Sequence, residues 1–144
     1  MMTCGHDWRA PRADQTLAEE IRPFVESYID AFDAANAPKI AALYHIPCVT
    51  VRGDGSVHCF QDKEVAQGFF QKVADTYLRD DCRRSRYFDL EVTPIGARSA
   101  LATLEWEQLR EDGSSIRRWR QSYNLVGDGA AWKILTSTFH QSGS

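Results

Sequence analysis

Histidine is the side chain whose ordinary pKa lies closest to neutrality, and two histidines of this sequence could transfer a proton. His140 follows the last stretch of alternating residues, and His45 follows a short apolar segment. Either imidazole could act as a catalytic acid or base together with the hydroxyl of Tyr28 or Tyr44. The alternative is structural, because His140 stands near the C-terminal end and His45 could cap a helix.

Metal binding is the second chemistry to consider. The segments His45-x-x-Cys48 and His58-Cys59 contain four possible soft-metal ligands. A two-residue turn at Asp54-Gly55 would pair Val51 with His58 and Thr50 with Cys59. Neighbouring residues of a strand point to opposite faces, so His58 and Cys59 could not both bind one tetrahedral ion. The sequence therefore predicts no metal site and indicates no cofactor, and the irregularly spaced cysteines favour free thiols.

Two Asp-Gly dipeptides organise the second half of the chain. Residues 97–139 are predicted to form three consecutive antiparallel strands, joined at Asp112-Gly113 and Asp128-Gly129. Asp-Gly between alternating segments is the strongest short signal for a hairpin. We expect a two-residue turn at each site, and these turns fix which residues lie opposite one another.

This register gathers large aromatic and polar side chains on one face of the sheet, called the inner face below. Aromatic rings mixed with a few polar groups are typical of a ligand cavity. The inner face therefore predicts a pocket for a small hydrophobic molecule; the alternative is a core in which the rings only fill space. The residues expected to bind the ligand are Trp106, Trp119, Gln121, Thr136 and Thr138, with Tyr44 as a further donor.

The opposite face, called the outer face below, supports the same register. Glu105 falls opposite Arg120, and Glu107 falls opposite Arg118, so unlike charges meet. The face also carries apolar side chains, which suit either a homodimer interface or an ordinary solvated sheet. The residues predicted to form that interface are Leu101, Leu135 and Phe139.

Three helices are predicted before these strands. The first runs to about residue 35, and Thr16 with Glu19 forms a capping box. Because Pro23 lies inside this span, the helix either kinks there or begins just before it. Further helices are predicted over 38–44 and from a cap at Asp62 to about 77, with strands over 46–51, 57–60 and 87–95, and residues 1–13 as a flexible leader.

Composition limits the classes of partner. The chain has 144 residues, of which 43% are hydrophobic, so it suits one domain with a sizeable core. The net charge of −3 argues against nucleic acid, because phosphate binding requires a basic face. No apolar run is long enough to cross a membrane, and no signal peptide is apparent, so we expect a cytoplasmic protein.

Over residues 17–140 the sequence resembles the SnoaL-like branch of the nuclear transport factor 2-like superfamily. The resemblance rests on the element order, on residues 98–106, and on the ending Arg-Trp-Arg-Gln-Ser-Tyr-Asn-Leu-Val followed by Asp-Gly-Ala-Ala-Trp-Lys-Ile. It implies an α+β, cystatin-like cone over residues 14–144. Three helices of the N-terminal half would pack on a strongly curved, mixed or antiparallel sheet of about six strands, often paired with a second copy.

The same resemblance implies a role for Tyr28, because ketosteroid-isomerase-like members use a tyrosine of the first helix. Those members also use pocket aspartates, whereas Gln121, Thr136 and Thr138 occupy the corresponding positions here. We therefore expect a protein that binds a small apolar or cyclic compound and could isomerise, dehydrate or cyclise it. The alternative is a non-catalytic module for ligand binding or protein interaction, dimerising through the outer face.

Overall fold

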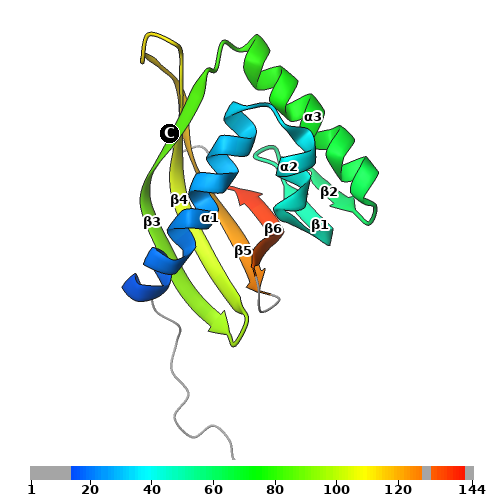
Figure 1. Cartoon of the computed structure of the whole chain (residues 1–144), viewed down its shortest axis with the longest axis vertical. Coiled ribbons are helices and arrows are strands. Elements are labelled where there is room, and N and C mark those ends of the chain that lie inside the picture. The colour runs from blue at the N-terminus through cyan, green and yellow to red at the C-terminus, as the bar shows by residue number, and fades with distance from the viewer. Residues whose placement is uncertain (1–13, 128–130, 142–144) are drawn as a thin grey trace, which may run out of the picture.

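The computed structural model describes residues 14–127 and 131–141. Within these residues, three helices pack on one six-stranded sheet, and this confirms the predicted α+β fold class. The sheet curves strongly around α1, with α2 and α3 over the end formed by β1 and β2 (Figure 1). The elements are α1 (Gln15–Asp33), α2 (Ala37–Ala42), β1 (Tyr44–Val51), β2 (Val57–Phe60), α3 (Lys63–Arg79), β3 (Arg84–Gly96), β4 (Ser99–Leu109), β5 (Ser115–Gly127) and β6 (Trp132–Phe139).

The first helix is continuous through Pro23 and begins at the earlier of the two predicted positions. Its N-cap is Asp14, whose carboxylate accepts from the backbone N–H of Leu17, so the predicted cap at Thr16 is two residues late. Asn36 and Asp62 cap α2 and α3 in the same way. A carboxylate or amide at the N-cap satisfies an N–H group that has no partner inside the helix.

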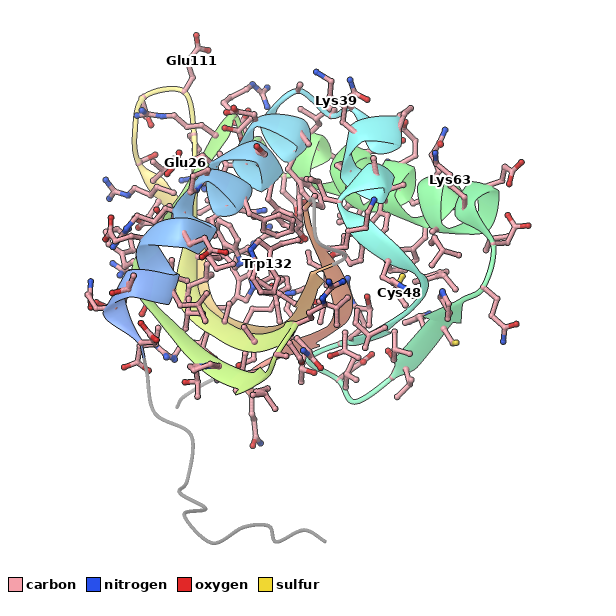
Figure 2. All side chains as sticks on the ribbon, turned by 60° about the horizontal axis from the view of Figure 1, so that its bottom comes forward. Glu26, Lys39, Cys48, Lys63, Glu111 and Trp132 are labelled. Atoms are coloured by element: carbon pink, nitrogen blue, oxygen red, sulfur yellow. The ribbon has the colours of Figure 1, made fainter. Side chains whose placement is uncertain are left out.

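The strands follow the order β2-β1-β6-β5-β4-β3. Of the strand pairs formed by the described residues, β1 and β6 run parallel and the others antiparallel. Their inner face and α1 together form the core, whose fully buried side chains include Ile21, Leu104, Leu125 and Ile134. Each such side chain contributes about 1.5–3 kcal/mol when it leaves water. Figure 2 shows side chains filling the hollow of the sheet, while Lys39, Lys63 and Glu111 point outward.

The β4–β5 register is as predicted, with Trp106 opposite Trp119, although the predicted turn is wrong. Arg110, not Glu111, closes the hairpin by bonding to Ser114, and the loop has three residues. Gly113 adopts a positive φ of 88°, which glycine tolerates best. A register shift just beyond the turn, between Gln108 and Leu109, compensates for the longer loop. The longer loop and the register shift offset each other, so the pairing beyond them is the predicted one.

The β5–β6 register departs from the prediction. Its Asp128-Gly129 turn lies outside the described residues, but Gly127 pairs with Trp132 instead of Ala130. A bulge then follows, because Leu125 pairs with Ile134 and Asn124 with Thr136. One extra residue on β6 shifts the alternation of side chains, so every later residue of β6 lies on the face opposite to the predicted one.

The β1–β2 hairpin is also shifted by one residue. Thr50 pairs with His58 instead of Cys59, and Val51 pairs with Val57. The loop between them has three residues and ends at Gly55, which has a positive φ of 88°. The prediction assumed a two-residue turn, and the longer loop moves the pairing.

Candidate functional site

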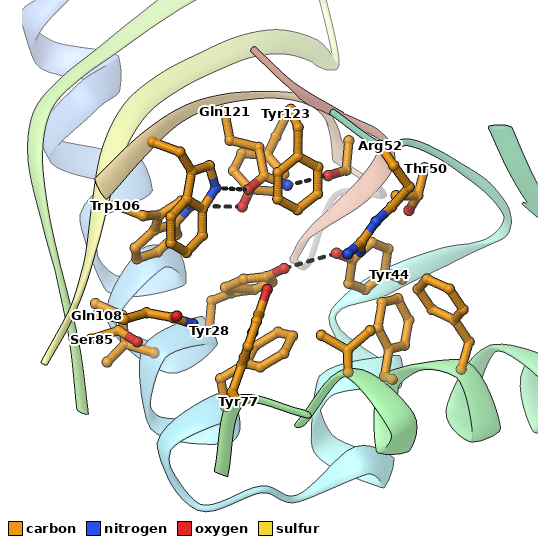
Figure 3. A pocket seen from close by; sticks show the side chains of 18 residues that line it. Tyr28, Tyr44, Thr50, Arg52, Tyr77, Ser85, Trp106, Gln108, Gln121 and Tyr123 are labelled. Carbon is orange, nitrogen blue, oxygen red and sulfur yellow. Dashed lines mark hydrogen bonds between the residues drawn. The ribbon is translucent and has the colours of Figure 1, made fainter. Parts of the chain in front are cut away.

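A cavity opens where the concave end of the sheet faces α1 and α3 (Figure 3). It contains roughly 560 Å³ of empty space, including the part of its mouth that is open to solvent. Aromatic rings dominate its wall, with hydroxyl and amide groups between them. The lining residues are Tyr28, Ile29, Phe32, Tyr44, Thr50, Arg52, Phe69, Phe70, Val73, Tyr77, Ser85, Trp106, Gln108, Trp119, Gln121, Tyr123, Ser137 and Phe139.

Two buried tyrosines from different elements meet at the floor of this cavity. The hydroxyl oxygens of Tyr28 on α1 and Tyr44 on β1 share a hydrogen bond of 2.8 Å (Figure 3). Burial raises the pKa of both phenols well above the ordinary value, so both remain protonated at neutral pH. The pair can therefore present a neutral hydroxyl to a ligand oxygen.

The two tryptophans of the β4–β5 pair have different environments. Trp106 is buried, stacks on Tyr28 with ring centroids 5.9 Å apart, and donates its indole N–H to the Tyr123 hydroxyl at 2.9 Å. Trp119 is only half-buried, and its indole N–H donates to the side-chain oxygen of Gln121 at 2.9 Å. Trp119 is therefore the tryptophan better placed to contact a ligand.

Gln121 is held from both ends of its amide. Its oxygen accepts from Trp119, and its nitrogen donates to the Ser137 hydroxyl at 2.5 Å. An amide fixed in this way keeps a single orientation. It also fixes the indole that forms one wall of the cavity.

One cation faces the cavity. The guanidinium carbon of Arg52 lies 4.8 Å from the ring centroid of Phe139 and 6.0 Å from that of Phe69. Asp54, the nearest acid along the chain, instead accepts from the backbone N–H and hydroxyl of Ser56. Within residues 14–127 and 131–141, Arg52 forms no ion pair.

Two polar atoms in the wall have no hydrogen-bond partner within the described part of the chain. They are the hydroxyl oxygen of Thr50 and the side-chain oxygen of Gln108, on residues that are 3% and 1% exposed. Buried polar atoms are almost always hydrogen-bonded, because leaving one unpaired costs about 1–3 kcal/mol. Both residues line the same cavity, which makes the two atoms candidate partners for a polar group of a bound molecule.

Thr136 and Thr138 do not line the cavity, and that prediction is wrong. The bulge in β6 pairs Thr136 with Asn124 and Thr138 with Ser122, both on the outer face. Ser137 and Phe139 take the inner positions in their place. Phe139 was predicted for the outer face, so the same bulge also corrects that assignment.

The predicted placement of His140 on the pocket face is wrong for the same reason. Its Nε2 atom lies 2.7 Å from the hydroxyl of Ser122, which also bonds to Thr103 on the outer face. His45 is exposed, and its Nδ1 atom lies 2.9 Å from the backbone oxygen of Pro47. Neither imidazole lines the cavity.

Five predicted residues do meet there: Tyr28, Tyr44, Trp106, Trp119 and Gln121. Arg52, Gln108 and Thr50 also line the cavity, although they were not predicted to do so. Arg52 directly follows a predicted strand, and Thr50 stands two residues before it on the same face, so alternation alone could have paired them. Gln108 stands two residues after Trp106 on β4, so the same alternation places it on the inner face.

The outer face carries ion pairs, but they are not the predicted pairs of Glu105 with Arg120 and Glu107 with Arg118. Arg118 bonds to Glu105 at 2.5 Å, diagonally across β4 and β5, while Glu107 pairs with Arg86 of β3 at 2.7 Å. The guanidiniums of Arg86 and Arg118 also lie 5.1 and 4.6 Å from the ring centroid of Phe88. Of the predicted interface residues, Leu101 is 38% exposed on this face, whereas Leu135 lies at the β6 bulge.

The possible metal ligands do not converge. Cys48 is buried, whereas His45 and Cys59 are exposed. Within the part of the chain that the structure describes, no three acidic, histidine or cysteine side chains are grouped as a metal site would require. No helix among the described residues is long and apolar enough to cross a bilayer.

Residues 18–142 match the model of the family described as NTF2-like protein (DUF6841). The chain belongs to this family. The match spans α1 to the end of β6, which confirms the predicted relationship to nuclear transport factor 2-like proteins. No curated protein sequence matches the chain.

Solved structures with the same fold support this assignment. Aln2 from a Streptomyces species is 12% identical with a TM-score of 0.73, over 89% of this chain and 92% of that one. A protein of unknown function with a cystatin-like fold from Nostoc punctiforme is 12% identical with a TM-score of 0.71, over 92% and 96%. An NTF2-like protein of unknown function from Pseudomonas putida is 16% identical with a TM-score of 0.68, over 92% and 91%. At these identities the likeness shows the fold alone.

Proposed function

We propose that the protein binds a small, planar, largely apolar compound in the cavity between α1, α3 and the sheet. The observation that carries this proposal is the composition of the wall, in which aromatic rings from every layer surround a space open to solvent. Pockets for small molecules have this composition, with a few polar groups among apolar and aromatic side chains. The half-buried ring of Trp119 would stack on the compound.

The wall suits binding and polarisation of a ligand oxygen better than removal of a proton. Its titratable groups are tyrosine hydroxyls, which stay neutral, and the guanidinium of Arg52. Tyr28 would act as a hydrogen-bond donor to the ligand, with Tyr44 holding its hydroxyl in place. Any isomerisation, dehydration or cyclisation in this cavity would need to use these donors, because both candidate histidines lie elsewhere.

A thermal-shift screen of planar cyclic compounds tests the proposal, because a ligand that binds only the folded state raises the melting temperature. Each compound that stabilises the wild-type protein is repeated on Trp119→Ala. Trp132→Ala is the matched control, because Trp132 is also half-buried but lies outside the cavity and donates to Glu20. We expect the shift to disappear in Trp119→Ala alone. Equal shifts in all three proteins would contradict the proposal.

A further inference from the structure

We infer that the ligand of this cavity is an aromatic carboxylic acid with a hydrogen-bond donor, such as a hydroxyl group, at the end opposite its carboxylate. The inference rests on the proposed function, since it assumes that the cavity binds a planar compound. It adds the chemical class of that compound. It is based on polar groups on opposite sides of the cavity (Figure 3). Among the described residues, Arg52 forms no ion pair, and one side-chain oxygen each of Thr50 and Gln108 has no hydrogen-bond partner.

Arg52 is the group that selects a carboxylate. Its guanidinium is half-buried against Phe139 and Phe69 and forms no ion pair among the described residues. A planar guanidinium presents two parallel N–H groups that match the two oxygens of a carboxylate. Contact with two rings holds the side chain at the cavity and partly shields it from water, so an ion pair there is stronger than one on the surface.

Thr50 completes the anionic end of the site. Thr50 is the second-last residue of β1, Arg52 directly follows that strand, and both residues line the cavity. Its hydroxyl oxygen is buried and unpartnered, and Figure 3 shows it beside Arg52 on one side of the cavity. The hydroxyl can donate to a carboxylate oxygen that Arg52 does not occupy.

Gln108 marks the other end. Its side-chain oxygen can only accept, so a ligand must supply an O–H or N–H group to satisfy it. Gln108 lies on β4, and two strands separate β4 from β1, so the backbones are roughly 14 Å apart along the sheet at a strand spacing of about 4.8 Å. Both ends line the same cavity, so one elongated ligand could contact both of them.

The aromatic residues between these ends account for the body of the ligand. Trp119 lies nearly parallel to Phe139, and Tyr77 projects into the space from α3 (Figure 3). Flat rings of this kind favour a flat ligand, because offset stacking maximises contact. A hydroxylated naphthoic acid has the required ring body and a polar group at each end.

Three probes test the inference by isothermal titration calorimetry at pH 7: 6-hydroxy-2-naphthoate, its methyl ester and 2-naphthoate. The ester keeps the rings and hydroxyl but removes the negative charge, whereas 2-naphthoate keeps the charge but removes the hydroxyl. We expect 6-hydroxy-2-naphthoate to bind at least tenfold more tightly than the ester and several-fold more tightly than 2-naphthoate.

Variants assign these preferences to residues. Arg52→Gln should abolish the preference for the acid over the ester, and Arg52→Lys should restore part of it. Gln108→Leu should abolish the preference for the hydroxylated acid. Arg117→Gln is the matched control, because Arg117 also lies near an aromatic ring, that of Tyr77, but pairs with Asp80 and does not line the cavity.

Each outcome decides between the two proposals. Tight binding of the ester with no preference for either acid would overturn the inference and leave the proposed function intact. Failure of all three probes to bind would count against both. If Arg52→Gln does not fold, as judged by circular dichroism, the comparison of the three probes on the wild-type protein still gives the answer.

Discussion

Trp119 stacks on Phe139, with ring centroids 6.1 Å apart and an angle of 17° between the rings. The contact depends on the bulge in β6, because without the extra residue a threonine would occupy the inner position next to Trp119. The same bulge places Phe139 under the guanidinium of Arg52. One inserted residue therefore creates both the apolar wall of the cavity and the support for its cation.

Replacing Trp119 by alanine should weaken ligand binding at least tenfold while the protein stays folded. A tryptophan ring supplies about 150–250 Å² of contact area, and this one is only half-buried in the protein itself. Calorimetry with a compound from the thermal-shift screen measures the effect. Trp132→Ala should bind with unchanged affinity, and an equal loss in both variants would indicate a general structural effect instead.

Removing one hydroxyl of the Tyr28–Tyr44 pair should destabilise the protein by about 1–3 kcal/mol, because the remaining hydroxyl is left buried without its partner. The double variant with phenylalanine at both positions should cost less than the sum of the two single changes. Urea denaturation measures all four proteins. Tyr77→Phe is a control, since within the described residues its hydroxyl makes no hydrogen bond. Additive costs would contradict a coupled pair.

Glu107 should make stability depend on acid pH. Two interactions lower the pKa of its carboxyl group below the ordinary value of about 4.5. They are a hydrogen bond with the Ser115 side chain and the ion pair with the Arg86 guanidinium. A carboxyl group whose pKa is lower in the folded state stabilises the fold above its ordinary pKa and loses that contribution as the pH falls through the lowered value.

Glu107→Gln should therefore lower the melting temperature at pH 7, and its difference from the wild type should shrink below pH 4.5. Melting curves from pH 3 to pH 8 measure the trend. Glu111→Gln, at an exposed hairpin position, should match the wild type throughout. A constant difference across this range would exclude the ion pair as the cause.

Self-association through the outer face stays a prediction, now resting on Leu101, because Phe139 lies inside. Leu101→Arg should convert a dimer to a monomer, since a charge would be buried without a partner. Light scattering after size exclusion measures the mass. Val57→Arg is the control, on the edge strand β2 far across the sheet and also exposed. A wild-type protein that is already monomeric would refute the prediction.

Thiol labelling should separate the described cysteines by burial. Cys59 is exposed, whereas burial raises the pKa of Cys48 to about 11 and also raises that of Cys82. In a Cys4→Ser background, we expect one fast-reacting thiol at pH 8, because the thiolate is the reactive form. Labelling of the other two should require denaturant. Adding Cys59→Ser should remove the fast phase, and its persistence would show that a buried thiol is accessible.

Local patterns predicted most of the fold. Helix caps, apolar spacing and the Asp-Gly turns are short-range signals, and they located three helices and the strands. The β4–β5 register was also predictable, because two charge pairs and two tryptophans had to match across it. The cap of α1 was misplaced by two residues, since Asp14 and Thr16 are both good caps and sequence alone does not rank them.

The site was predictable only in part. Tyr28, Trp106 and Gln121 lie in elements whose register was correct, and they do meet in the cavity. His140 was assigned to the wrong face because no signal in the sequence marks a bulge at Leu135. A single inserted residue reverses every later side chain of a strand, so a small local error changes the whole candidate chemistry.

The sequence by itself determined the family, the order of helices and strands, and the aromatic character of one sheet face. These follow from periodicity and turn chemistry, which act between neighbours along the chain. Only the tertiary structure decided which polar groups face the cavity. Thr50 lies on β1, Arg52 directly follows that strand, and Gln108 lies on β4, which is not adjacent to β1 in the sheet. The curvature of the sheet brings these residues to one cavity.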